Sequence, residues 1–355
     1  MKDIDVIEDL DPGLLDPNTS GPAQSAPLEM PHGLVYVTDA MPGIRRLKRG
    51  KGFTYVAPDG TTIERGPERE RLEKLGVPPA YERVWMCPLP NGHLQATGYD
   101  ARNRKQYRYH PEWSSHRAGH KYDKLVEFGH ALPTIRARVQ RDLKAPPGEA
   151  RFALAAAVTL IDRLSLRVGN EEYARENGSF GALTLRNKHV RLRDGEIRLD
   201  FKAKSGQRVR RSLKDRRLLQ ILEKASDLPG AELLTWVDRM GQVHSLSSTQ
   251  LNAYLDEADG DDDLAFTAKT FRTWAGTLAA FELLEQGGRP KIKDLAEAAS
   301  QRLHNTPTVA KAHYIHPRIL ALAGEAPDLP PAEPLPGLSA TEARLLAFLE
   351  SPDLT

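Results

Sequence analysis

The sequence predicts an α+β protein in which a small, mainly β N-terminal domain precedes a larger, mainly α-helical domain. Up to about residue 110, short apolar runs alternate with turn signals such as Pro-Asp-Gly and Pro-Asn-Gly, which is typical of strands. Beyond residue 112, apolar residues recur at helical spacing. A chain of 355 residues, 40% of them hydrophobic, is long enough for two cores. We therefore expect a disordered acidic tail at 1–30, the β-rich domain at 31–112, the helical domain at 113–320 and a Pro-rich, acidic C-terminal tail at 321–355.

The β-rich domain should consist of short strands and one helix. The pattern predicts the helix at 68–75 and strands at 34–38, 50–56, 61–64, 84–87 and 93–97. The domain ends in a basic run at 98–110 that interleaves cations with Gln106, Tyr107 and Tyr109. Cations bind phosphates, while Gln and Tyr can reach base edges or stack on them. A basic β-hairpin with alternate aromatics buried explains the same run equally well.

The larger domain begins with helices at 124–130 and 134–143, which Pro133 should separate, and an alanine-rich buried helix at 149–163. Four short strands should follow, at 183–185, 190–193, 197–201 and from Val209 onward. Further helices are expected at 215–225, 248–257, 267–284 and 293–303. A last short helix should start at Pro307, be capped by Asn305 or Thr306, carry Tyr314 and stop at Pro317.

Charge is distributed unevenly along the chain. Its net charge is +2, but residues 1–30 carry seven acidic groups against one lysine, and residues 321–355 carry six against one arginine. A basic body between acidic ends favours a polyanionic partner such as DNA or RNA, although an unevenly charged, solvated surface has the same composition. No apolar run is long enough to span a membrane. Cys87 is the only cysteine, which excludes an internal disulfide and fits a reducing cytosol.

Four residues of the helical domain suit the cleavage of a phosphodiester bond. That reaction needs a nucleophile, positive charge for the non-bridging oxygens and a proton for the leaving oxygen. The chain offers Arg167, Lys204, Arg272 and Tyr314, in that order. A phosphotyrosine ester keeps the bond energy for religation, and guanidinium groups can hold phosphate oxygens in bidentate fashion. Taken alone, Tyr314 reads more simply as a half-buried tyrosine whose hydroxyl is satisfied.

The motifs around these residues resemble those of type IB DNA topoisomerases, in particular the small bacterial and poxvirus-like group. The resemblance covers residues 31–320. Its motifs are Arg163-Leu-Ser-Leu-Arg-Val-Gly169, Leu183-Thr-Leu-Arg-Asn-Lys-His189, Phe201-Lys-Ala-Lys-Ser-Gly206, Lys269-Thr-Phe-Arg-Thr273 and the segment from Asn305 to Tyr314.

The resemblance implies a role for each catalytic candidate. Tyr314 is the nucleophile that forms a 3′-phosphotyrosyl link, Arg167 and Arg272 contact the scissile phosphate, and Lys204 is the general acid toward the 5′-oxygen. The family usually has a histidine nine residues before the tyrosine, where this chain has Asn305. The asparagine amide can donate a hydrogen bond but carries no charge. We expect Asn305 to replace the histidine, and we do not expect the neighbouring His304 to be the phosphate ligand.

The resemblance also implies contacts with DNA outside the catalytic set, because the basic run resembles the family's DNA-contacting hairpin. The expected DNA-binding residues are Arg104, Lys105, Gln106, Tyr107, Tyr109, Lys188 and Lys269. For Lys188, a plain solvated charge is an equally good interpretation.

The sequence thus predicts relaxation of supercoiled double-stranded DNA without ATP or metal, by a monomer in the cytoplasm on the nucleoid. No Walker motif or zinc-ligand spacing is present, so neither a nucleotide nor a cofactor or metal site is expected. One alternative is a tyrosine recombinase or integrase. Recombinases typically carry His at the position of Lys269 and a helical N-terminal domain, which argues against it. A second alternative is a catalytically silent DNA-binding clamp, for which Asn305 is the hint.

Overall fold

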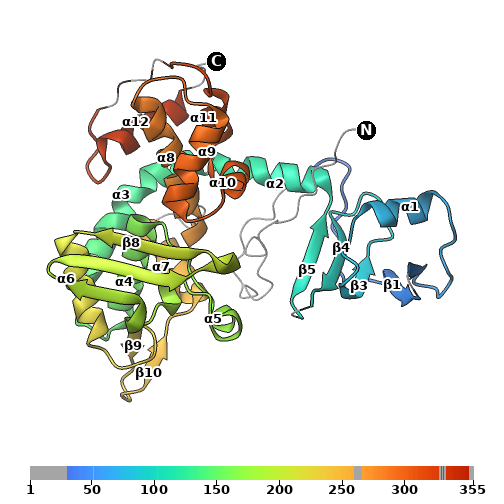
Figure 1. Ribbon diagram of the computed structural model, residues 1–355, viewed down its shortest axis with the longest axis horizontal. Helices are drawn as coiled ribbons and strands as arrows, with labels where there is room; N and C mark the ends of the chain where they lie inside the picture. The colour runs from blue at the N-terminus through green and yellow to red at the C-terminus, as the bar shows by residue number, and fades with distance from the viewer. Residues whose placement is uncertain are drawn as a thin grey trace. The chain divides into compact units, whose positions relative to one another are not determined.

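The computed structural model describes residues 30–50, 52–101, 103–259, 266–327, 329, 331 and 333–351. The chain divides into two compact units, Met1–Lys121 and Tyr122–Thr355. The first is built around a β-sheet and the second is mainly helical, which confirms the predicted α+β class (Figure 1). The tail expected at 1–30 lies outside the described residues, apart from Met30.

The sheet of the first unit has five antiparallel strands in the order β2-β1-β3-β4-β5. They are β1 Ile44–Arg49, β2 Gly52–Val56, β3 Glu82–Met86, β4 Leu94–Tyr99 and β5 Lys105–Tyr109, and helix α1 Pro67–Lys74 lies between β2 and β3 in the chain. Ile44, Tyr55, Leu72, Val84 and Met86 form its core. The unit is therefore a sheet with one small helix packed on it.

Two predicted strands of this unit are wrong, and one strand is unforeseen. The segment 34–38 makes a single bridge from Val35 to Gly92, and 61–64 makes one from Val56 to Thr62. Strand β1, in contrast, has almost no apolar alternation. Its inward-facing Arg46 is buried and donates to the carbonyls of Val77 at 2.6 Å and Pro78 at 2.8 Å. The strand thus places an arginine where the pattern requires an apolar residue.

Helix α2, Pro111–Asp123, runs from the first unit into the second and leads to α3, Leu125–Asp142. The sequence predicts two helices separated by Pro133, but α3 is one helix with Pro133 inside it. Leu125, Phe128, Leu132, Ile135 and Val139 line a continuous buried face on both sides of the proline. Packing of this face into the larger core outweighs the lost backbone hydrogen bond.

A three-stranded antiparallel sheet, β6-β7-β8, lies in the larger unit. Its strands are β6 Val190–Arg193, β7 Glu196–Lys202 and β8 Arg208–Leu213, and the next helix is α6, Arg216–Ser226. One face buries Ile197, Leu199, Phe201 and Val209 in the larger core, while the other carries exposed charges. The strand predicted at 183–185 is wrong: Ala182–Thr184 is a 3₁₀ turn whose Leu183 N–H donates to the carbonyl of Val168 at 2.7 Å.

Most of the remaining helices pack against α8. Its bounds are Ala268–Glu285, and the others are α4 Ala150–Leu164, α5 Glu171–Asn177, α7 Ser248–Asp259, α9 Ile292–Leu303, α10 Pro307–Tyr314, α11 Pro317–Ala321 and α12 Ala340–Glu350. A small hairpin of β9 Thr235–Val237 and β10 Val243–Ser245 precedes α7. Helix α10 packs against α8 and α9. In the part of the chain that the structure describes, no helix has the length and apolarity needed to cross a membrane.

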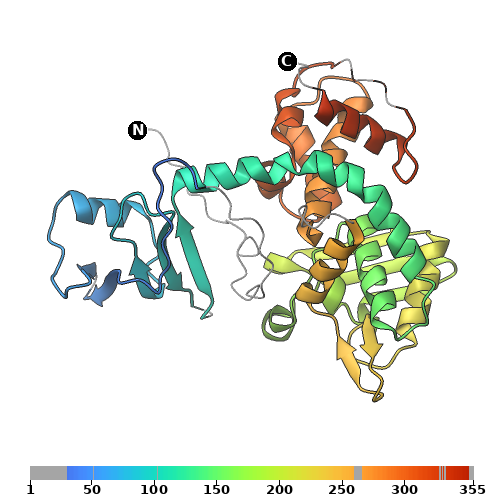
Figure 2. The ribbon, with the colours of Figure 1, turned by 180° about the vertical axis from the view of Figure 1, so that it is seen from behind.

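Helix α12 belongs to the segment that the sequence assigns to a C-terminal tail, and it packs against α3 and α8. In Figure 2 it is the dark red helix beside the orange α8. Arg136 of α3 bonds both carboxylate oxygens of Glu342 on α12, at 2.9 and 3.0 Å. It also makes a bidentate pair with Asp162 of α4 at 2.8 and 2.9 Å. A cation between two carboxylates thus ties three helices together.

Candidate active site

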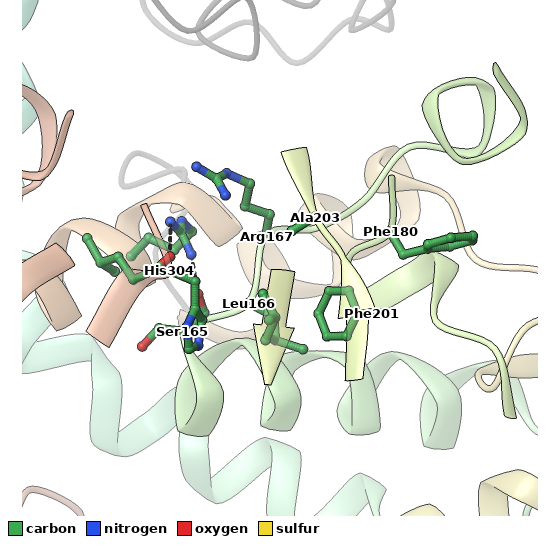
Figure 3. A pocket seen from close by; sticks show the side chains of 10 residues that line it. Ser165, Leu166, Arg167, Phe180, Phe201, Ala203 and His304 are labelled. Carbon is green, nitrogen blue, oxygen red and sulfur yellow. Dashed lines mark hydrogen bonds between the residues drawn. The ribbon is translucent and has the colours of Figure 1, made fainter. Parts of the chain in front are cut away.

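A pocket of the larger unit brings together residues from several separate segments (Figure 3). Arg167 comes from the loop after α4, Ala203 from the turn between β7 and β8, Arg272 from α8, and His304 from the end of α9. Figure 3 shows the Arg167 side chain extending away from Phe201. The structure therefore places two of the predicted arginines, Arg167 and Arg272, in one pocket.

Arg272 is held by backbone carbonyl groups. Its side chain is only 4% exposed, and one terminal nitrogen donates to the carbonyl of Leu303 at 3.0 Å. The other donates to the carbonyl of Ser165, whose left-handed backbone (φ 52°) ends α4. Neutral acceptors orient a guanidinium group without cancelling its charge. The arginine is therefore fixed in direction by two segments that meet at the pocket.

Tyr314 is the last residue of α10 and is 3% exposed. Its ring packs against Ala275 and Leu303, and the Arg272 guanidinium carbon lies 5.2 Å from the centre of the ring. The Thr277 hydroxyl donates to the Tyr314 carbonyl at 3.2 Å and accepts from the backbone N–H of His316 at 3.1 Å. The structure thus brings the predicted nucleophile to Arg272, with the backbone fixed on either side of it.

Asn305 and His304 lie where α9 ends. His304 adopts a left-handed conformation (φ 53°) and lines the pocket, and its Nε2 accepts a hydrogen bond from Nε of Arg211 at 3.2 Å. Burial, followed by the charges of Arg211, Arg272 and Arg167, lowers the pKa of His304 to about 4, so the ring is neutral at pH 7. Both polar side-chain atoms of Asn305 are buried without a hydrogen-bond partner among the described residues. An unsatisfied buried amide is costly unless a ligand completes it.

Lys204 lies in the turn Lys204–Gly206 that joins β7 to β8, directly after the pocket-lining Ala203. It is half-buried and does not itself line the pocket. A second lysine of this hairpin, Lys202, is exposed and donates to the carbonyl of Asn177 at 3.3 Å. Both lysines adjoin residues that line the pocket, and they differ in that Lys202 is exposed whereas Lys204 is half-buried.

The other predicted DNA-binding residues are divided between the two units. In the first unit, Arg104 pairs with Asp100 at 2.6 Å and Lys105 with Asp39 at 2.5 Å, while Gln106 donates to Asp100 at 3.2 Å.

The ring centres of Tyr107 and Tyr109 lie 6.1 Å apart and the rings are stacked. In the second unit, Lys188 is exposed in the turn Asn187–His189. Lys269 is half-buried on α8, one turn before Arg272. Because residues three apart share a helix face, Lys269 and Arg272 lie on the same side of α8.

The sequence does not single out one residue of this neighbourhood, Arg211 of β8. The usable signal is its position two residues after Val209, because alternate residues of a strand point to the same face. Val209 lines the pocket, and Arg211 reaches His304. Across the described ranges, no group of His, Cys, Asp or Glu is arranged to hold a metal ion.

Two family models match the chain. Residues 110–314 match the catalytic core of eukaryotic DNA topoisomerase I, and residues 52–100 match the N-terminal domain of bacterial DNA topoisomerase IB.

Individual relatives agree with these matches. The chain is 30% identical over 303 residues to DNA topoisomerase 1B of Acanthamoeba polyphaga mimivirus, and the aligned region covers 81% of this chain and 89% of the relative. It is 26% identical over 163 residues to DNA topoisomerase 1B of vaccinia virus (strain Copenhagen), covering 44% of this chain and 51% of the relative. It is 32% identical over 176 residues to mitochondrial DNA topoisomerase I of Rattus norvegicus, covering 46% and 27%. These matches confirm the resemblance seen in the motifs, and the chain belongs to the type IB DNA topoisomerase family.

Proposed function

We propose that the protein relaxes supercoiled double-stranded DNA by cutting one strand, allowing rotation about the other and resealing the cut. The Tyr314 oxygen attacks the scissile phosphorus and loses its proton to solvent, and the bond from phosphorus to the 5′-oxygen breaks. Lys204 donates a proton to the leaving 5′-oxygen. Religation is the reverse: the 5′-hydroxyl attacks, and Tyr314 leaves as the phenol. No net bond is made or lost, so no nucleotide needs to be hydrolysed.

The observation that carries this proposal is the meeting of Arg272 with Tyr314 and Arg167. Arg272 lies 5.2 Å from the centre of the tyrosine ring and shares a pocket with Arg167. Two guanidinium groups stabilise the extra negative charge that the phosphoryl oxygens gain in the transition state. The buried amide of Asn305 can donate to a third position on the same phosphate. Because Tyr314 is 3% exposed here, its hydroxyl must become accessible to the phosphate when DNA binds.

We further propose that the enzyme acts as a monomer on the DNA of the nucleoid, in the cytoplasm, without a metal or nucleotide. One chain supplies all five catalytic candidates, and its single cysteine, Cys87, is buried. The matched bacterial topoisomerase IB N-terminal domain favours this function over a tyrosine recombinase, whose N-terminal domain is usually helical.

A covalent-trapping experiment tests the chemistry. A duplex oligonucleotide with a short strand downstream of the cut loses that strand on cleavage and cannot reseal. Stopping the reaction with SDS should reveal a protein–DNA adduct at the 3′-phosphate of the labelled strand. Tyr314→Phe should form none, while its affinity for the same duplex stays unchanged. An adduct of equal yield in Tyr314→Phe would exclude Tyr314 as the nucleophile, and absence of an adduct in the wild type would favour the silent clamp.

A further inference from the structure

Arg211 is a cation on the pocket side of β8, and the catalytic scheme above does not use it. Side chains alternate along this strand, so that Arg208 and Arg210 are exposed while Val209 is buried and Arg211 half-buried. Arg208 makes a bidentate pair with Asp200 at 2.6 and 2.9 Å, and Arg210 approaches Asp200 at 3.6 Å. Neighbouring arginines of one strand therefore differ in both direction and partner.

The acceptors that Arg211 contacts are neutral. Its Nε donates to Nε2 of His304 at 3.2 Å, and a terminal nitrogen lies 3.5 Å from the carbonyl oxygen of Arg302. Within the described part of the chain, Arg211 has no ion pair with a carboxylate. Burial, and after it the charge of Arg302, lowers the pKa of Arg211, so the folded protein places this charge in an unfavourable position. An arginine kept half-buried without a counter-ion suits a site whose counter-ion is a ligand.

The contact with His304 links Arg211 to the catalytic pocket, which Arg211 does not itself line. His304 lines the pocket together with Arg167 and Arg272. Because its Nε2 accepts from Arg211, the proton of the neutral ring is on Nδ1. Burial is the main reason that the pKa of His304 is lowered, and the three nearby arginine charges oppose its protonation further. His304 thus acts as a neutral support that orients a guanidinium group.

We propose that Arg211 is a third guanidinium group for the scissile phosphate, and that it supplies the positive charge that the Asn305 amide lacks. His304 is the positioning residue that holds it. The proposal rests on the proposed function, because it assumes that the pocket receives a phosphodiester. With Arg211, the site has a cation in place of the charge that a histidine nine residues before the tyrosine could carry and that Asn305 cannot.

Single-turnover cleavage of the trapping duplex by the full-length protein tests this proposal. Arg211→Gln should slow cleavage about 100-fold, in the range seen when one transition-state donor is removed. The matched control is Arg210→Gln, which removes the same charge from the next residue on the opposite, exposed face, and it should change the rate less than about threefold. The thermal midpoints of both variants establish that each is folded.

A neutral phosphate analogue separates charge stabilisation from a structural role. In a methylphosphonate, a methyl group replaces one charged oxygen of the scissile phosphate, so less negative charge remains for Arg211 to stabilise. The difference between wild type and Arg211→Gln should then shrink to under about threefold. Asn305→His in the Arg211→Gln background should restore the rate at least about tenfold, because a histidine can carry the missing charge.

Several outcomes would overturn the proposal. Equal effects of Arg211→Gln and Arg210→Gln would reduce Arg211 to a general phosphate contact. A defect that persists undiminished on the methylphosphonate would make Arg211 structural. His304→Gln keeps an acceptor for Arg211 whereas His304→Leu does not, so identical rates for these two variants would remove His304 as its support. If the wild type forms no adduct, the proposed function fails first, and that result is distinguishable from all of these.

Discussion

Gly276 of α8 lies directly against the segment that carries the nucleophile, and Gly276→Ala tests how tightly that segment is positioned. A Cβ at this position would lie 2.6 Å from the Tyr314 carbonyl oxygen and 2.9 Å from the Tyr314 Cβ. It would also lie 2.9 Å from Cδ1 of Leu303. The leucine methyl can rotate away, but the two Tyr314 atoms belong to the backbone or are attached to it. The end of α10 must therefore move by several tenths of an ångström.

The expected effect on stability is small, while the effect on catalysis is large. Alanine gains about 1 kcal/mol over glycine inside a helix, and overpacking a core costs about 1–3 kcal/mol, so the net loss should be about 1 kcal/mol. A displacement of the reacting group by about 1 Å can cost about 100-fold in rate, and we expect single-turnover cleavage to fall about 10- to 100-fold.

Gly129→Ala is the matched control. Gly129 is a helical glycine of the same unit, but its added Cβ would meet Cδ1 of Leu346 at 2.8 Å and the Trp274 ring at 2.9 Å, not α10. It should lose stability in urea unfolding and cleave DNA at the wild-type rate. The reasoning is refuted if Gly276→Ala cleaves within about threefold of wild type, or if both variants lose activity in proportion to their stability.

Three further predictions concern the helix core and the catalytic set. Arg136→Met should destabilise the larger unit by about 3 kcal/mol at pH 7, because it leaves Glu342 buried without its cation. In the wild type, burial raises the pKa of Glu342, but the bonds from Arg136 outweigh this effect and the pKa is lowered overall. The pair therefore stabilises the fold above the ordinary glutamate pKa, and this stabilisation is lost as the pH falls. In the variant, burial raises this pKa without the opposing bonds from Arg136. The loss in free energy of unfolding, measured in urea, should therefore be smaller at pH 5 than at pH 7. An equal loss at both pH values would contradict the assignment. Lys204→Gln should slow cleavage with a normal 5′-oxygen leaving group by at least about 100-fold. It should not slow cleavage with a 5′-thiolate leaving group, which needs no proton. Lys202→Gln should cleave like wild type, and the reverse behaviour of the two variants would assign the general acid to Lys202. Asn305→Ala should slow adduct formation about tenfold at unchanged DNA affinity, and an unchanged rate would remove its amide from the phosphate.

The fold class followed from the sequence because alternation and helical spacing occupy different parts of the chain, whereas local details depended on tertiary contacts. Pro133 was expected to end a helix, but the apolar spacing continues through it and α3 packs into the core on both sides of it. Strand β1 escaped prediction because Arg46 takes an inward position, where three backbone carbonyls satisfy its guanidinium group.

The candidate site was predictable to the extent that its residues occur in recognisable motifs. The motifs of Arg167 and Arg272 predicted that both arginines belong to one site, and the structure places them in one pocket. Arg211 could not be separated from Arg208 and Arg210 by type or spacing alone. Only the β8 register and the position of His304 show which arginine contacts a residue that lines the pocket. The burial of Tyr314 likewise depends on Leu303 at the end of the preceding helix and on Gly276 of α8, which is farther away in the sequence.

The most direct test of the central claim is relaxation of a supercoiled plasmid by the purified protein in EDTA without ATP, for wild type and Tyr314→Phe. We predict that wild type converts the plasmid to relaxed topoisomers and that SDS traps a covalent 3′ adduct. Tyr314→Phe should bind the plasmid but do neither. Relaxation by Tyr314→Phe at the wild-type rate, or tight DNA binding by wild type with neither relaxation nor adduct, would contradict the account.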